Sequence, residues 1–166
     1  MTLKLSIKKI LYRLLSIFSF TLFFLLFVAL FPRFNNELVG VIILLCIGVL
    51  PNIILLVEYF ITTVKIDTAV FSENHLNVTF KNGDVRDYKY TDIKVIELYK
   101  AAGMDKGNYS FKSNERYYFA KIVAKDGRKL ILTSLLGPDL GDALDLIKGV
   151  SIDRTKTGYA FIFMSR

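Results

Sequence analysis

The chain has 166 residues, a net charge of +7 and a single cysteine, and 53% of its residues are hydrophobic. This length allows one ordinary domain together with a short apolar segment. The lone cysteine, Cys46, lies within an apolar run, so the composition argues against both a disulfide framework and a thiol cluster for metal binding.

The positive charge is not distributed as in a nucleic-acid-binding protein. Four basic residues come before the first apolar run, in a segment without acidic residues, whereas Lys and Arg alternate with Asp and Glu after residue 64. A nucleic-acid interface gathers its basic residues on one face. We therefore expect no nucleic-acid partner and interpret the N-terminal charges, Lys4, Lys8, Lys9 and Arg13, as a topology signal.

Residues 1–13 form a short basic arm with alternating apolar positions. Two interpretations remain open. By the positive-inside rule, the charges simply keep the N-terminus in the cytoplasm. Alternatively, the arm lies on anionic lipid, where each lysine near the surface contributes about 1 kcal/mol.

Two apolar runs without charged residues, 14–31 and 38–57, follow the arm. At about 1.5 Å per residue, a helix over the second run spans the roughly 30 Å hydrocarbon core of a bilayer. The first run is long for a signal peptide and lacks a small-x-small cleavage pattern. The six residues 32–37 join the runs, so we expect an antiparallel transmembrane hairpin with both termini in the cytoplasm.

Polar residues within the hairpin predict helix packing. Pro51 removes one backbone donor, and Asn52 places an amide near the middle of the membrane. Ser16 and Ser19 of the first run are candidate hydrogen-bond partners for this amide. A permeation or sensing role for Asn52, as in a small transport or channel subunit, is the weaker alternative.

Aromatic and charged residues flank both apolar runs, as expected for an interfacial belt. We expect this belt to contain Tyr12, Arg13, Glu58, Tyr59 and Phe60.

From residue 64 the hydrophobic period changes to two, which predicts an antiparallel meander. Asn82-Gly83 is a strong hairpin signal, and we expect a type I′ turn there. Asp126-Gly127 marks a second hairpin. The predicted strands cover residues 64–71, 76–80, 85–90, 95–99, 117–124 and 129–136.

The sheet is followed by one predicted helix and an apolar tail. Asp139 offers an N-cap, and apolar residues recur at helical spacing over 140–147. The tail over 157–164 is too apolar for a free terminus. We expect a last strand there, with contact to the membrane surface or to a partner as the alternative.

The order of these elements, the segment Tyr90-Thr91-Asp92-Ile93 and the run 131–136 resemble bacterial membrane proteins that carry a PH-like domain behind paired transmembrane helices. The resemblance implies an α+β fold in which the C-terminal helix closes a bent barrel or sheet. It also implies a helical anchor over 1–63, a cytoplasmic PH-like domain over 64–166, and location in a prokaryotic inner membrane.

The lipid-headgroup site of PH relatives is not carried over. Phosphoinositide-binding members have basic residues around the first hairpin loop, whereas this loop is Ser72-Glu73-Asn74-His75. Many eukaryotic members also have a Trp in the closing helix, and this chain has no Trp. The resemblance therefore implies the scaffold and leaves the ligand open.

The residues of the polar half do not predict catalysis. His75 is the only histidine, and it lies in a predicted turn without a neighbouring thiol. The carboxylates Asp84, Asp87 and Asp92 lie at turns and strand ends, where they ordinarily contact solvent. We expect a non-enzymatic protein without a catalytic residue, metal site or cofactor.

The long segment 101–116 is the candidate binding element, since loops of this length in compact domains often bind partners. Its mixture of basic and aromatic residues suits a protein interface or, as the alternative, anionic lipid; a merely solvated hairpin tip remains the plain interpretation. We therefore predict a scaffold or protein-interaction module at the membrane. The predicted binding residues are Lys106, Tyr109, Phe111, Lys112 and Arg116.

Overall fold

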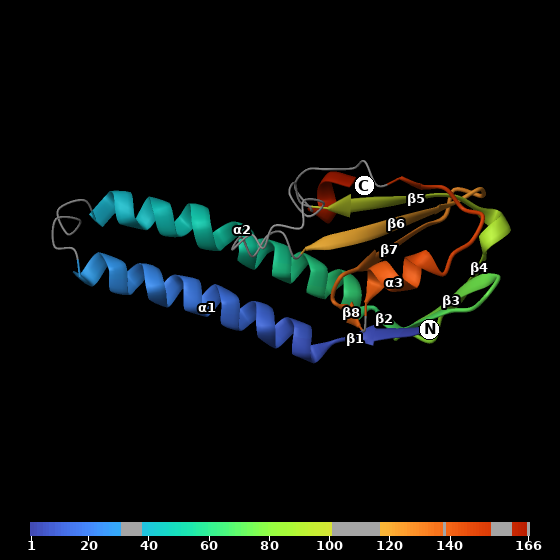
Figure 1. Cartoon of the computed structure of the whole chain (residues 1–166), viewed down its shortest axis with the longest axis horizontal. Helices are drawn as coiled ribbons and strands as arrows, with labels where there is room; N and C mark the ends of the chain where they lie inside the picture. The colour runs from blue at the N-terminus through green and yellow to red at the C-terminus, as the bar shows by residue number, and fades with distance from the viewer. Residues whose placement is uncertain (31–37, 101–116, 138, 154–160, 166) are drawn as a thin grey trace.

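The computed structural model describes residues 1–30, 38–100, 117–137, 139–153 and 161–165. Two long helices, α1 (Ile7–Leu30) and α2 (Leu38–Val64), lie side by side and extend from one end of a β-rich domain (Figure 1). The fold is α+β, with mostly antiparallel strands, as predicted.

Helix α1 begins earlier, and α2 ends later, than predicted, so both helices reach closer to the sheet. The predicted runs 14–31 and 38–57 become helices 7–30 and 38–64. Within the described residues, one stretch, Ile7–Leu26, is long and apolar enough to cross a membrane. The apolar stretch Val49–Val64 of α2 is shorter, so the predicted pair of spans is not established by these helices.

Two sheets form the domain. The first has the strand order β4-β3-β2-β1-β8 and the second has the order β7-β6-β5-β9. All neighbours pair antiparallel except β5 and β9. The strands are β1 (Thr2–Leu5), β2 (Ile66–Phe71), β3 (His75–Phe80), β4 (Val85–Lys89), β5 (Ile93–Lys100), β6 (Tyr118–Ala124), β7 (Lys129–Thr133), β8 (Leu136–Gly137) and β9 (Ile152–Asp153).

Strand β1 corrects the interpretation of residues 1–13 as an arm. Leu3 is fully buried in the main core, and β1 pairs with β2 on one side and β8 on the other. Only Ser6 separates β1 from α1, and only Lys65 separates α2 from β2. Residues 2–5 are therefore a component of the sheet, residues 7–13 are the first turns of α1, and both helices join the sheet directly.

The short helix α3 (Leu140–Asp145) packs on the sheets as the predicted closing helix does. Leu140, Ala143, Leu144 and Ile147 are buried in the main core. Asp139 caps the helix by accepting a hydrogen bond from the Gly141 N–H at 2.7 Å. Burial of the three side chains of the helix, and of Ile147 just after it, holds α3 to the sheets.

The two predicted hairpins are present, but the turn type at Asn82-Gly83 was wrong. Gly83 has a φ of +88°, whereas no described residue other than glycine has a positive φ. A type I′ turn needs positive φ at both central positions, so this turn is the three-residue kind in which glycine follows a type I turn. The hairpin at Asp126-Gly127 is built in the same way, with Gly127 at +87°.

The expected last strand over 157–164 is also wrong for its described part. Residues Ile162–Ser165 form a short 3₁₀ helix, η5, beside α2. Residues 154–160 lie outside the described part of the chain. The strand that joins the second sheet late in the chain is instead β9, which pairs with β5 in parallel.

Candidate functional site

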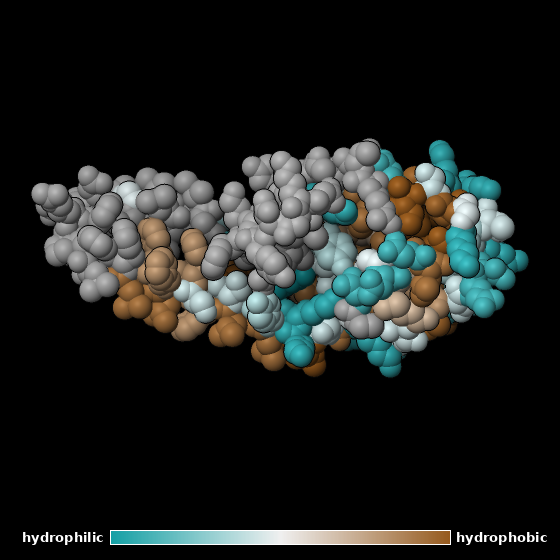
Figure 2. All heavy atoms as spheres, viewed as in Figure 1, coloured by the Kyte–Doolittle hydropathy of each residue, from teal (hydrophilic) through white to brown (hydrophobic). Residues whose placement is uncertain are grey.

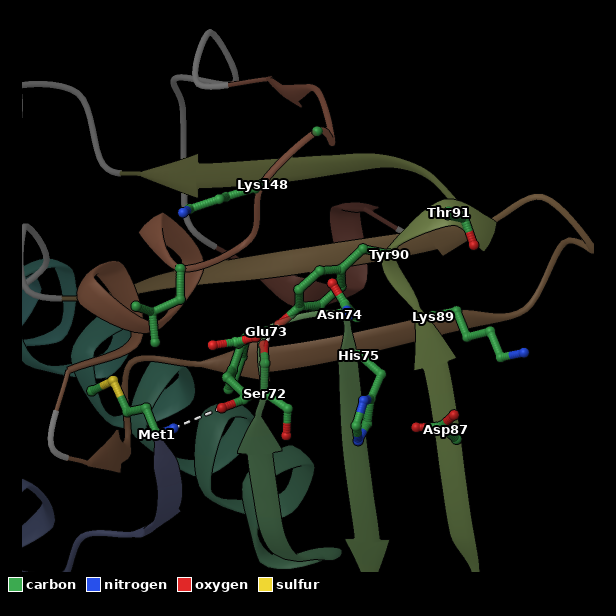
Figure 3. Close-up of a pocket in the computed structure, with 13 residues that line it drawn as sticks. Met1, Ser72, Glu73, Asn74, His75, Asp87, Lys89, Tyr90, Thr91 and Lys148 are labelled. Carbon is green, nitrogen blue, oxygen red and sulfur yellow. Dashed lines mark hydrogen bonds between the residues drawn. The ribbon is translucent and has the colours of Figure 1, made fainter.

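A groove of about 990 Å³ lies at the end of the domain opposite the tips of α1 and α2 (Figures 1 and 3). The β2–β3 turn, the end of β4 and the chain after α3 surround it. Its lining residues are Met1, Phe71, Ser72, Glu73, Asn74, His75, Asp87, Lys89, Tyr90, Thr91, Leu146, Lys148 and Gly149.

The β2–β3 turn is held in place by hydrogen bonds to backbone carbonyl groups in and beside it. The Tyr90 hydroxyl donates to the Ser72 carbonyl at 2.7 Å, and the Tyr90 N–H donates to the Asn74 carbonyl at 3.0 Å. The Met1 amino group donates to the Phe71 carbonyl at 2.6 Å, as drawn in Figure 3. Burial raises the pKa of Tyr90 above its ordinary value. One wall of the groove is therefore preformed.

Charged side chains of both signs line the groove. His75 on β3 pairs with Lys89 on β4, and their side chains and that of Asp87 are exposed (Figure 3). Within the described part of the chain, neither Asp87 nor Lys89 makes an ion pair, and the same holds for Glu73 and Lys148. These four charges can therefore pair with a ligand.

The charge pattern is unlike that of a phosphate site. A phosphate group is bound by converging cations and N–H donors, whereas Glu73 and Asp87 here lie in the same groove as the two lysines. Alternating charges with apolar Leu146 at the edge suit a polypeptide surface better. Among the described residues, no group of three His, Cys, Asp or Glu side chains is placed to hold a metal ion.

A second polar cluster joins the helices to the sheet. Lys9 donates through Nζ to the carbonyls of Ser134 and Leu136 at 3.2 and 3.0 Å. One turn later, Arg13 donates through Nη2 to the Ser134 hydroxyl at 2.8 Å. From α2, the Thr63 hydroxyl is hydrogen-bonded to that of Thr133. Both helices thus bind the end of β7 or the residues that follow it: α2 contacts Thr133, and α1 contacts Ser134 and Leu136.

This cluster changes the interpretation of the N-terminal charges and of the belt. Lys9 is half-buried and Arg13 is only 7% exposed, whereas Lys4 and Lys8 are exposed. Of the expected belt, Tyr59 is also buried, 5.0 Å from the Tyr117 ring. Two of the four basic residues are therefore structural, a role that a count of charges cannot reveal.

The predicted binding residues Lys106, Tyr109, Phe111, Lys112 and Arg116 all lie outside the described residues. The described positions on either side, Lys100 and Tyr117, are at the end of the second sheet that faces the helices (Figure 1). The described residues that flank the segment 101–116 therefore lie at the opposite end of the domain from the groove.

The predicted helix-packing residues remain a prediction. Asn52 is buried on α2 and Pro51 lies inside the same helix, while Ser16 is half-buried and Ser19 is exposed on α1. The groove itself was missed. The charges at alternate positions 87 and 89 of β4 are the one signal that pointed to it, but Lys148 comes from a distant part of the chain.

A comparison with known protein families gives a match. A family model described as a PH domain matches residues 2–140, which includes β1, both helices and seven further strands. No curated protein matches the chain.

Proposed function

This chain belongs to the PH domain family. We propose that it is a membrane-anchored, non-enzymatic module that binds a protein partner through the groove. PH domains are generally non-catalytic modules that bind lipids or proteins. In this proposal the helices anchor the chain in a prokaryotic inner membrane, with both termini in the cytoplasm.

Exposed apolar side chains on the helices support the anchor. Brown, hydrophobic atoms gather along α1 in Figure 2, while teal, hydrophilic atoms gather over the domain. Water disfavours such a contiguous apolar surface on a soluble protein. On α1 the large exposed apolar residues are Ile7, Leu11, Leu14, Leu15, Phe18, Phe20, Leu22, Phe23, Leu25 and Leu26.

The joints between helices and sheet support a fixed orientation of the domain. Ser6 and Lys65 are the only residues between a helix and its strand. The hydrogen bonds of Lys9 and Arg13 then tie α1 to the β7–β8 segment. Without a linker, the domain has to follow the helices, so it would be presented at a constant height above the membrane.

One observation carries the choice of a protein partner: the groove lies at the end of the domain remote from the helix tips (Figure 1). If the helices are inserted in a bilayer, the groove faces away from that bilayer. Its charges of both signs, Glu73, Asp87, Lys89 and Lys148, would then be available to other proteins.

Direct recognition of anionic lipid is the second candidate, and a separate observation favours it. Lys100 and Tyr117, which flank the segment 101–116, lie at the end of the domain where the helices leave it. Basic side chains in that segment would be near the headgroups, where each contributes about 1 kcal/mol.

Site-specific photo-crosslinking in cells tests the proposal. A photoreactive amino acid at Asp87, in the groove, should give a discrete adduct that contains a second protein. The same amino acid at Asp67, exposed on β2 outside the groove, is the matched control and should give none. Charge reversal by Lys89→Glu together with Lys148→Glu should remove the adduct. No adduct at Asp87 but a protein adduct at Tyr109 would move the interface to the segment 101–116.

A further inference from the structure

The C-terminal turn η5 is anchored to α2 by a side chain of that helix. The Glu58 carboxylate accepts hydrogen bonds from the N–H groups of Ile162 and Phe163 at 3.1 and 2.6 Å. The Ile162 side chain is 1% exposed, in a cluster that includes Tyr59 and Phe119. The turn is therefore held firmly against the junction of helix and sheet.

The same turn directs one aromatic ring outward. Phe163 is 53% exposed, and its ring lies 5.3 Å from that of Phe161. Glu58 and Ile61 lie on one face of α2, because residues three apart are neighbours on a helix. Ile61 is exposed too, so Phe163 extends the exposed apolar surface of α2.

The length of the helices sets the depth of this turn in the membrane. From Leu38 to Glu58, α2 rises about 30 Å, which is the thickness of the hydrocarbon core. On α1, about 30 Å measured back from Leu30 reaches Ile10. A bilayer around the helix pair thus has its domain-side boundary beside Glu58, near the exposed rings of Tyr12 and Phe60.

We propose that residues 161–163 are a membrane contact, in which Phe163 inserts at the boundary between headgroups and acyl chains of the bilayer that the helices enter. Apolar aromatic side chains on an otherwise amphipathic surface bind at this depth. The inference rests on the proposed anchoring. With α1 and α2, the turn gives the domain a third point of contact and so fixes its tilt.

The absence of Trp from the chain provides a clean test. Phe163→Trp introduces one fluorophore into the full chain, reconstituted in phosphatidylcholine and phosphatidylglycerol vesicles that contain brominated lipid. Two matched variants report other depths. Phe23→Trp lies on the exposed surface of α1, and Leu146→Trp lies at the groove.

We expect Phe163→Trp to be quenched at least twofold by lipid brominated near the headgroup, and less by lipid brominated near the chain end. Phe23→Trp should be quenched by lipid brominated along the chain, and Leu146→Trp should not be quenched. If the Trp fluorescence of Phe163→Trp is solvent-like and unquenched while that of Phe23→Trp is quenched, the proposed contact is wrong and the anchor still holds. An unquenched Phe23→Trp would overturn the anchor and, with it, this inference.

Discussion

Arg13 of α1 lies against the face of Tyr117, with its guanidinium carbon 4.1 Å from the centre of the ring. The same guanidinium donates to the Ser134 hydroxyl, so one side chain from the helix binds both ends of the β6–β7 hairpin. A cation over an aromatic ring contributes about 0.5–2 kcal/mol, more when it is desolvated. Arg13 therefore acts as a joint between α1 and the second sheet.

Substitution of Arg13 should destabilise the fold much more than substitution of its exposed neighbour. Arg13→Gln removes the charged hydrogen bond and the ring contact, so we expect a loss of about 2–4 kcal/mol in the free energy of unfolding. Lys8→Gln, on the exposed surface, should change it by less than about 0.5 kcal/mol. Denaturant unfolding in detergent measures both, and equal effects would refute the structural role of Arg13.

Glu58 should control the exchange of two amide hydrogens near the C-terminus. Glu58→Gln replaces two charge-assisted hydrogen bonds by weaker ones, at a cost of about 1.4 kcal/mol or more. We expect hydrogen exchange at Ile162 and Phe163 to accelerate about tenfold. Glu73→Gln, at the groove, is the control and should leave exchange at these two sites unchanged; an equal acceleration in both variants would argue against the Glu58 contact.

The hairpin glycines should tolerate asparagine better than alanine. A Cβ at Gly83 or Gly127 meets no atom within 4 Å, so the cost of a side chain comes from the positive φ alone. We expect Gly83→Ala to lose about 1–2 kcal/mol in the free energy of unfolding, and Gly83→Asn to lose less. Thermal unfolding of both variants checks this, and equal losses would contradict the assigned turn.

Alkaline pH should weaken the fold in part through Tyr118. Burial, and then the hydrogen bond that its hydroxyl donates to Asp139 at 2.9 Å, raise the pKa of Tyr118 above its ordinary value of 10. The unfolded chain loses this proton first, so the stabilisation is complete below pH 10 and is lost as the pH rises above it.

The variant Tyr118→Phe isolates this contribution. Above pH 10 the free energy of unfolding should fall less steeply with pH in this variant than in the unchanged protein. The difference in slope should be up to about 1.4 kcal/mol per pH unit, which is the value for one proton. At neutral pH the variant should be less stable by about 1 kcal/mol, because the hydrogen bond to Asp139 is lost. A decline as steep as that of the unchanged protein would contradict the raised pKa.

Local patterns predicted much of the domain because its strands and its closing helix have strong signals in sequence. The period-two segments became β2 to β7, and the stripe at Leu140, Ala143, Leu144 and Ile147 is buried. Strand β1 was missed, since Thr2–Leu5 is short and basic and pairs with β2, more than sixty residues away. Its apolar residues do alternate, but four residues are too few to indicate a strand when the pairing partner is so distant in sequence.

The candidate site was predictable only in part, for the same reason. The first hairpin loop was correctly described as lacking Lys and Arg, but Lys89 and Lys148 reach the same groove from elsewhere in the chain. Their convergence depends on the packing of α3 against the sheets. Likewise, the sequence around Arg13 does not distinguish it from the other basic residues before the first apolar run. Its role follows from its contacts with Tyr117 and Ser134, which are distant in sequence.

We propose that the helices are inserted in the membrane and that the groove lies on its cytoplasmic side. Labelling with a membrane-impermeant maleimide in bacterial spheroplasts tests it most directly. In a Cys46→Ser background, Glu73→Cys at the groove should react only after the membrane is permeabilised, while Asn35→Cys, between the helices, should react in intact spheroplasts. Labelling of Glu73→Cys in intact spheroplasts, or recovery of the chain in the soluble fraction, would contradict the account.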